Sequence, residues 1–562
     1  MKEKYIKLME KALSAYTDEH ILRYFNDVKT NGLTEHGFPR LTANIGVLIA
    51  HGRRRDLLPL FLEMMDFCCE QIPQCKAAND FSVREIICCI WELEAVPETV
   101  SAERISRWRA LLATIEPENC YNSYAQSLKG TTRNWAIFMT VSELFRERAG
   151  LRGDATDFID THLSHQMKWF DENGMYEDNK YADGCHQPIM YDYSTRGLCS
   201  LLLRFGYKGK YREEIDGYLK NAALMSLGMQ SPSGEIPFGG RSNQYLMCEG
   251  WQAQLFEFEA DRYAADGDIK TAAAFKRAAV CSVEVCERWL SHSPISHIKN
   301  RFPTNSRNGC EAYGYFDKYM ITTASNFYVA YLMCNDDIPV AEDAERPPYV
   351  FATSDYFHKF FIGNADHQLE FDLNADPHYD ANGLGRIHRE GAPSTICLSC
   401  PCPAEPGYTV DIETPFAFSM CSAIRGKDGW LFGAEKDTKY EVSEYKADKK
   451  SASATLLCRF SDDRTVREHY TLDENGVSIT AEGDGEIGYT LPAFCFDGEV
   501  SPEIAVGKHS LEVSYDGWVC RYTTNGVICD PGRIAANRNG HYRAFISTSQ
   551  NTLNVKIEIT KV

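Results

Sequence analysis

The first 335 residues carry a helical pattern of hydrophobic positions. Apolar residues recur at intervals of three and four, which places them on one face of an α-helix. Short links with Gly, Pro and Asn separate these segments, and no strand pattern lies between them, so we expect antiparallel helical hairpins. The predicted helices cover residues 41–50, 54–69, 83–95, 104–115, 134–147, 155–170, 196–204, 211–227, 245–263, 270–290 and 316–334.

The pattern changes near residue 336. Residues 336–348 are polar and rich in proline, which indicates a linker. Beyond it, apolar and polar residues alternate in runs that are separated by turn signals of the Asn-Gly type. The alternating runs include 369–373, 511–515 and 553–559. The sequence therefore predicts an α+β multidomain protein, with a helical domain in residues 1–335 and an antiparallel β-sandwich in residues 349–562.

Charge and composition narrow the classes of partner. The 562 residues are 44% apolar and 25% charged, as in an average folded protein, and carry a formal net charge of −20. Nucleic acid is excluded as a partner because phosphate binding needs a basic face. An anionic ligand would need a local basic pocket. No run of about 18 apolar residues occurs, so we expect no membrane span.

The cysteines and the N-terminal segment bear on location. The 21 cysteines are odd in number and lack the spacing of a disulfide framework, which favours reduced thiols. Residues 1–7 lead into an amphipathic helix and show no secretory signal. We therefore expect a cytoplasmic protein, although a chain trimmed of its signal would look the same. Assembly into a homo-oligomer is left open.

Residues 181–197 hold the densest candidate chemistry. A loop with Gly and Pro runs into an apolar helix, and His186, Tyr191, Tyr193 and Arg196 cluster at this junction. His186 and Tyr193 are the first candidates for proton transfer. Two tyrosines two positions apart point to different sides of a helix, so only one should face a cleft. We prefer Tyr193, with Tyr191 in reserve.

Polar side chains also gather at the starts of other predicted helices. Asn134 precedes Trp135, where it could bind a ligand or merely cap the helix. The loop 231–244 could deliver donors to a carboxylate or to sugar hydroxyls. Its candidate residues, with one carboxylate from the helix that follows, are Glu235, Arg241, Asn243, Gln244 and Glu249.

Two further segments are candidates for substrate contact. Residues 297–313 concentrate positive charge, including Arg301 and Arg307, and form either an anion site or a solvated loop. Residues 376–390 lie between strand patterns, and we expect them to reach over the open end of the helical domain. They carry Tyr379, Arg386 and His388, and they leave open a divalent ion held by Asp376, His378 and Asp380.

Helical hairpins followed by a β-sandwich resemble the heparinase II/III-like and chondroitin-lyase-like polysaccharide lyases, and also related six-hairpin glycoside hydrolases that act on uronic acids. The resemblance implies an (α/α) toroid before the sandwich, and we expect the active site between the two parts. In those lyases an Asn, then a His and a Tyr, then an Arg and a Glu line the cleft. The resemblance assigns these roles to Asn134, His186, Tyr193, Arg241 and Glu249.

The reaction implied by the resemblance is β-elimination at a uronic acid. Asn134 and Arg241 would neutralise the carboxylate beside the acidic C5 proton, and His186 or a tyrosine would remove that proton. No organic cofactor or metal is needed. The expected partner is an anionic, uronic-acid-containing oligosaccharide or polysaccharide.

Two alternatives remain open. A glycoside hydrolase on the same scaffold, such as a glucuronidase, would use two carboxyl groups, with candidates Asp183, Glu235, Glu249 and Glu311. A non-catalytic carbohydrate-binding protein is less favoured, because the reactive side chains fall at the ends of successive hairpins instead of on one aromatic strip.

Overall fold

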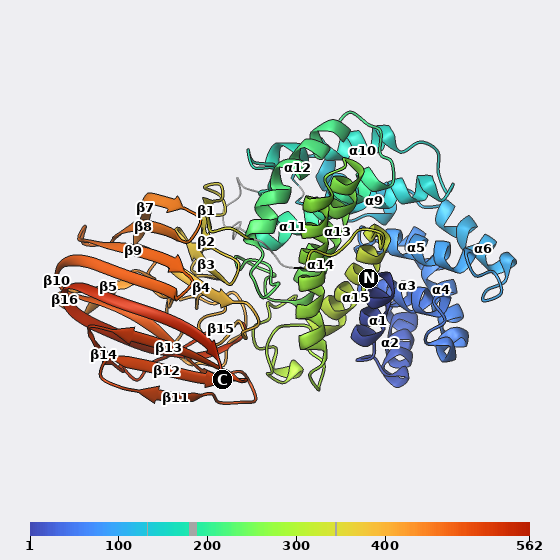
Figure 1. Cartoon of the computed structure of the whole chain (residues 1–562). Coiled ribbons are helices and arrows are strands. Elements are labelled where there is room, and N and C mark those ends of the chain that lie inside the picture. Colours follow the sequence, from blue (N-terminus) through green and yellow to red (C-terminus); the bar gives the residue numbers. More distant parts are fainter. Residues whose placement is uncertain (132, 179–187, 343–345) are drawn as a thin grey trace.

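The computed structural model describes residues 1–131, 133–178, 188–342 and 346–562. Helices fill the first part of the chain, and strands fill the second (Figure 1). The last helix ends at Met333 and the first strand begins at Tyr349. The predicted α+β class, a helical toroid followed by an antiparallel sandwich, is confirmed.

Six inner helices form a closed ring in the described part of the helical region. Each packs against the next, and the last returns to the first. The ring consists of α3 (Gly37–Ala50), α5 (Ser82–Glu94), α9 (Trp135–Arg148), α11 (Ile189–Arg204), α13 (Leu246–Ala265) and α15 (Phe316–Met333). Inner helices are buried on nearly all sides, as in α3, where every residue except Ala50 is buried. This burial explains why their sequences are apolar over more than one face.

Outer helices alternate with the inner ones along the chain and cover the ring. Among the packed pairs, α14 lies on α13, α12 on α11, α10 on α9, α4 on α3 and α1 on α15. The main outer helices are α1 (Lys2–Leu13), α2 (Asp18–Asn31), α4 (Leu58–Gln71), α6 (Ala102–Ala113), α10 (Thr156–Leu163), α12 (Arg212–Met229) and α14 (Ile269–Leu290). None of the helices in the described ranges is long and apolar enough to cross a membrane.

The strand region consists of two antiparallel sheets that share one core. The smaller sheet has the order β1-β2-β3-β4, and the larger one runs β11-β12-β13-β16-β10-β9-β8-β7, with β5, β6, β14 and β15 at its side. The smaller sheet comprises β1 (Tyr349–Ala352), β2 (Lys359–Gly363), β3 (His367–Asp372) and β4 (Gly383–Arg389). The larger comprises β5 (Ser422–Arg425), β6 (Trp430–Phe432), β7 (Lys439–Ala447), β8 (Ala452–Arg459), β9 (Thr465–Asp473), β10 (Gly476–Phe496), β11 (Glu503–Val506), β12 (Ser510–Tyr515), β13 (Trp518–Thr524), β14 (Val527–Cys529), β15 (Ile534–Asn537) and β16 (Gly540–Lys561).

Strands β2, β3 and β4 of the smaller sheet are buried on both faces. In β2, Phe360 and Ile362 belong to the sandwich core, whereas Phe361 packs into the core of the helical ring. Side chains of β3 also alternate between two buried faces. Leu369 and Phe371 face the sandwich core, and Glu370 between them is buried in an ion pair. The polar positions of these strands therefore face the helical region and not solvent.

Candidate functional site

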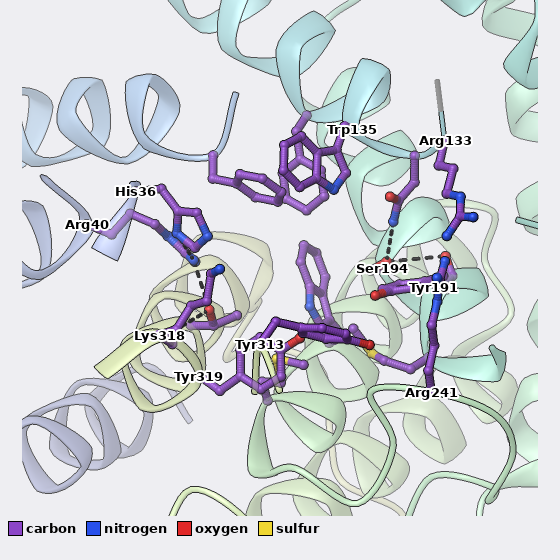
Figure 2. Close-up of a pocket in the computed structure, with 17 residues that line it drawn as sticks. His36, Arg40, Arg133, Trp135, Tyr191, Ser194, Arg241, Tyr313, Lys318 and Tyr319 are labelled. Carbon is purple, nitrogen blue, oxygen red and sulfur yellow. Dashed lines mark hydrogen bonds between the residues drawn. The ribbon is translucent and has the colours of Figure 1, made fainter. Parts of the chain in front are cut away.

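A cavity of about 390 Å³ lies where the six inner helices begin (Figure 2). Every inner helix contributes a residue from its first turns or from the position just before it. The lining consists of His36, Arg40, Phe81, Arg133, Asn134, Trp135, Phe138, Met190, Tyr191, Ser194, Arg241, Met247, Trp251, Tyr313, Lys318, Tyr319 and Thr322. Because helix N-termini carry partial positive charge, this arrangement directs several favourable dipole ends at one space.

Asn134 enters this cavity with its side chain free of a capping role. It precedes α9, yet its side chain makes no cap hydrogen bond. Its Nδ2 donates to Ser194 Oγ at 3.3 Å, and its backbone N–H donates to Asp178 Oδ1 at 3.3 Å. The capping alternative is thus wrong. The amide is held by the first turns of the neighbouring inner helix, with its carbonyl oxygen and second N–H available to a ligand.

Tyr191 faces the cavity and Tyr193 does not. Tyr193 is fully buried in the core of the ring, so the preference for it as the tyrosine at the cleft is corrected. The Tyr191 hydroxyl lies 3.1 Å from Ser242 Oγ. Burial raises the pKa of Tyr191, while the nearby Arg241 guanidinium acts in the opposite direction. The hydroxyl is therefore protonated at neutral pH and able to donate.

Arg241 lies against Tyr191. Its guanidinium carbon is 4.9 Å from the centre of the Tyr191 ring, and Nη2 is 3.2 Å from Asp178 Oδ2. The glycines before it, with φ of +146° at Gly239 and +69° at Gly240, let the loop turn towards the cavity. Figure 2 shows Arg241, Arg133, Tyr191 and Ser194 at one end of the cavity. The cavity thus brings together the Asn134 amide, the Arg241 guanidinium and a phenol, with Tyr191 in the place expected for Tyr193.

A second cationic group, which sequence reasoning missed, lies at the opposite end of the cavity (Figure 2). Arg40 donates to Glu85 at 2.9 Å and to Thr322 at 2.8 Å, and its Nη1 lies 3.4 Å from His36 Nδ1. Lys318 completes the group. Burial lowers the pKa of His36 well below its usual value, and Arg40 and Lys318 lower it further, so this imidazole is neutral. The polar residues just before α3 were the sequence signal that could have identified this cationic group.

The lining is cationic in a strongly acidic protein. Arginine and lysine side chains reach the cavity from four separate segments, and no Asp or Glu is among its described lining residues. The aromatic walls include Trp135, Trp251 and Tyr313. Anionic, partly apolar ligands such as acidic sugars suit a cavity of this kind, since charge pairs with the cations and the sugar faces pack on rings.

The predicted carboxylates lie elsewhere. Glu235 and Glu249 are buried around Lys299, whose Nζ is 3.1 Å from Glu235 Oε2 and 2.8 Å from Glu249 Oε1. Burial acts to raise the pKa of Glu235, but the Lys299 charge keeps it below the usual value, whereas burial raises the pKa of Glu249. Neither residue lines the cavity. Glu249 is on the first turn of α13, but it turns into the protein towards Lys299.

Three other predicted contacts are interior ion pairs or buried groups. Arg196 is fully buried and donates to Asp192 at 2.8 Å. Arg386 and His388 belong to β4 itself, not to a loop over the helical ring, and both are almost fully buried. Arg386 Nη2 lies 2.8 Å from Glu370 Oε2. The period-two alternation of β4 sends both side chains towards the helical region, away from the cavity.

The remaining candidates hold loops in place. Asn243 donates to the Pro237 carbonyl at 3.1 Å, and Gln244 donates to Asn243 Oδ1 at 2.6 Å. Arg301 Nε lies 3.4 Å from Asp497 Oδ2 in the sandwich, and Arg307 donates to the Ala312 carbonyl at 2.6 Å.

Tyr379 lies beneath the Arg538 guanidinium, 5.7 Å from it. His186 and Asp183 lie outside the described residues. In the described ranges no group of three or more His, Cys, Asp or Glu could hold a metal ion, the set around Asp376 included.

Of the predicted site residues, Asn134, Tyr191 and Arg241 line the cavity.

No protein-family model matches the chain, and no curated protein matches it. Solved structures do: the chain is similar to heparinase III (10% identity, TM-score 0.46, 93% of this chain and 76% of that one). It is also similar to a heparan sulfate lyase HepC mutant from Pedobacter heparinus, with 10% identity and a TM-score of 0.45 over 93% of this chain and 76% of that one. A polysaccharide lyase is similar with 11% identity and a TM-score of 0.38 over 59% of this chain and 97% of that one.

Proposed function

We propose that this protein is a lyase that cleaves uronic-acid-containing oligosaccharides or polysaccharides by β-elimination in the cavity at the start of the inner helices. The observation that carries the proposal is the meeting of Asn134, Tyr191 and Arg241 in a cationic cavity whose described lining has no carboxylate. Such a set binds and polarises a carboxylate but lacks the acid and base pair of a glycosidase.

The side chains have complementary roles in the proposed reaction. The Asn134 amide and the Arg241 guanidinium bind the uronate carboxylate and stabilise the charge that develops when C5 loses its proton. A base takes that proton, the C4–O bond breaks, and a C4=C5 double bond forms. Tyr191, protonated at neutral pH, donates a proton to the departing oxygen. His186 is the proposed base, in keeping with the sequence prediction.

The hydrolase alternative needs two carboxyl groups that face the scissile bond, separated by roughly 5–9.5 Å. Of its four candidates, Asp183 lies outside the described residues, Glu235 and Glu249 share Lys299, and Glu311 is bound to Arg538. Because of these ion pairs, none of the three glutamates is a free acid in the cavity. Elimination creates an unsaturated uronate that absorbs in the ultraviolet, and hydrolysis does not. Incubation with uronic-acid oligosaccharides therefore separates the two classes, and a saturated product would contradict the lyase.

A further inference from the structure

Ser242 has a strained backbone at the edge of the cavity. Its φ is +60°, in the left-handed region that a serine rarely adopts. Its backbone N–H donates to Glu311 Oε1 at 2.6 Å, and Glu311 is almost fully buried. A non-glycine residue keeps such a conformation only when its surroundings hold it there. Glu311 holds the Ser242 N–H, and Cys248 Sγ lies 3.3 Å from the Ser242 carbonyl oxygen.

The Ser242 hydroxyl is the meeting point of three phenols. It lies 3.1 Å from the hydroxyl of Tyr191 and 3.2 Å from those of Tyr313 and Tyr319. All three tyrosines line the cavity. A hydroxyl donates one hydrogen bond and accepts two, so this contact set uses its full capacity. The position of Ser242 therefore sets the position of the Tyr191 hydroxyl.

Glu311 is in turn held by the sandwich. Arg538, in the turn between β15 and β16, lies with Nη2 2.6 Å from Glu311 Oε1 and donates through Nη1 to the Gly309 carbonyl at 2.7 Å. The Tyr245 hydroxyl donates to the other Glu311 oxygen at 2.5 Å. Burial acts to raise the pKa of Glu311, but the Arg538 charge and these hydrogen bonds hold it below the usual value. The carboxylate thus stays ionised as long as Arg538 is present.

We propose that Arg538 is a positioning residue for the reaction in the cavity: it holds Glu311, Glu311 holds the strained Ser242, and Ser242 orients the Tyr191 hydroxyl. This inference rests on the proposed function. It gives the sandwich a part in catalysis although no sandwich residue is among the described lining of the cavity. Arg538 and Ser242 act on the orientation of Tyr191 and not on the binding of the carboxylate.

The test compares Arg538→Met, Arg538→Lys and Ser242→Ala in the full chain on a uronic-acid oligosaccharide. We expect Arg538→Met to lower kcat about 100-fold with KM changed less than about threefold, because misplacing a reacting group costs rate and not binding. Arg538→Lys should recover part of kcat, since it restores the charge beside Glu311. Ser242→Ala should lower kcat similarly while its backbone still donates to Glu311. The double variant should be no slower than either single variant, because both act through one chain of contacts.

Lys276→Met is the matched control. It removes a buried ion pair of the same kind, with Nζ 2.6 Å from Glu257 Oε2, that has no hydrogen bond to the cavity lining. Its kcat should match the wild type once the protein is folded. Arg538→Met with wild-type kcat, a loss confined to KM, or additive losses in the double variant would overturn the proposal. If Arg538→Met does not fold, Arg538→Gln, which also removes the charge beside Glu311, decides by the same kcat and KM criteria.

A crystal structure of Arg538→Met gives a readout that does not depend on activity. The proposal predicts that the Tyr191 and Ser242 hydroxyls separate beyond hydrogen-bonding distance, and an unchanged pair would refute it. Wild-type protein that forms no unsaturated product would contradict the lyase function instead, whichever way the crystal structure comes out.

Discussion

At the scale of single residues, the cavity depends on which side of a helix each polar group takes. Tyr191 and Tyr193 are two positions apart on α11, and the helix turns one to the cavity and the other into the core. Asn134 reaches the cavity because its side chain does not cap α9. Two tyrosines of one helix therefore have different surroundings, one at the cavity and one in the core.

Tyr191→Phe should lower kcat by at least about 100-fold, since it removes the proposed proton donor and keeps the ring. Tyr193→Phe is its natural control, because that hydroxyl lies in the core of the ring, and we expect its kcat within about threefold of wild type. Steady-state rates of unsaturated product formation measure both. Equal losses in the two variants would show that Tyr191 acts only through packing.

Asn134→Asp should reduce kcat/KM by about 100-fold or more, because a carboxylate of nearly the same shape would repel the substrate carboxylate that the amide is proposed to bind. Ser194→Ala removes only the hydroxyl that accepts the Asn134 hydrogen bond, so its loss should be smaller. Circular dichroism verifies that both variants are folded. An Asn134→Asp enzyme as active as the wild type would remove this residue from the mechanism.

At the scale of helices and strands, hydrophobic periodicity predicted the fold well because burial sets the pattern. The predicted helix 245–263 corresponds to α13 (Leu246–Ala265), and the alternation in 369–373 gave β3. Hydrophobic periodicity could not show whether the polar face of a strand contacts solvent or another part of the protein. It gave no reason to expect that the charged face of β3 and β4 packs on the helical region, and therefore Arg386 and His388 were expected in the site.

The site itself was only partly predictable. Asn134 and Arg241 stood out as polar residues beside helix starts, and the structure brings them together with Tyr191. The sequence could not place His36 and Lys318 in the same site as these residues. They come together only because the ring closes and brings α3 and α15 next to the other inner helices. Glu249 was misassigned since Lys299, fifty positions later, draws its carboxylate into the interior.

The segment before α15 holds a buried histidine that should make stability depend on pH. His297 Nε2 lies 2.9 Å from the Gly314 carbonyl, and burial lowers its pKa to about 4. An unfolded histidine titrates near 6.5, so this depressed pKa contributes stability that is present above about pH 6.5 and is lost as pH falls towards 4, at most about 3 kcal/mol.

His297→Gln retains a side-chain donor but does not titrate. The difference in unfolding free energy between the wild type and this variant should therefore change by up to about 3 kcal/mol between pH 7 and pH 4, with the wild type losing stability. Urea denaturation at each pH measures it. A difference that does not vary with pH would rule out a neutral, buried His297.

At the scale of the whole molecule, the cavity lies within the helical ring, and the sandwich is proposed to support it. The ring directs six helix starts and several cationic side chains at one cavity in a protein of net charge −20. The sandwich joins the helical region through the buried Arg538–Glu311 ion pair and through Phe361, which packs into the ring core. A site that depends on both parts should lose activity whenever their junction is disturbed.

The most direct test of the lyase assignment is the ultraviolet absorbance of the products formed from a uronic-acid oligosaccharide by the wild type and by Tyr191→Phe. The account predicts an unsaturated uronate from the wild type and at least about 100-fold slower formation by the variant. Cleavage that yields only saturated ends, at equal rates in the two proteins, would contradict it.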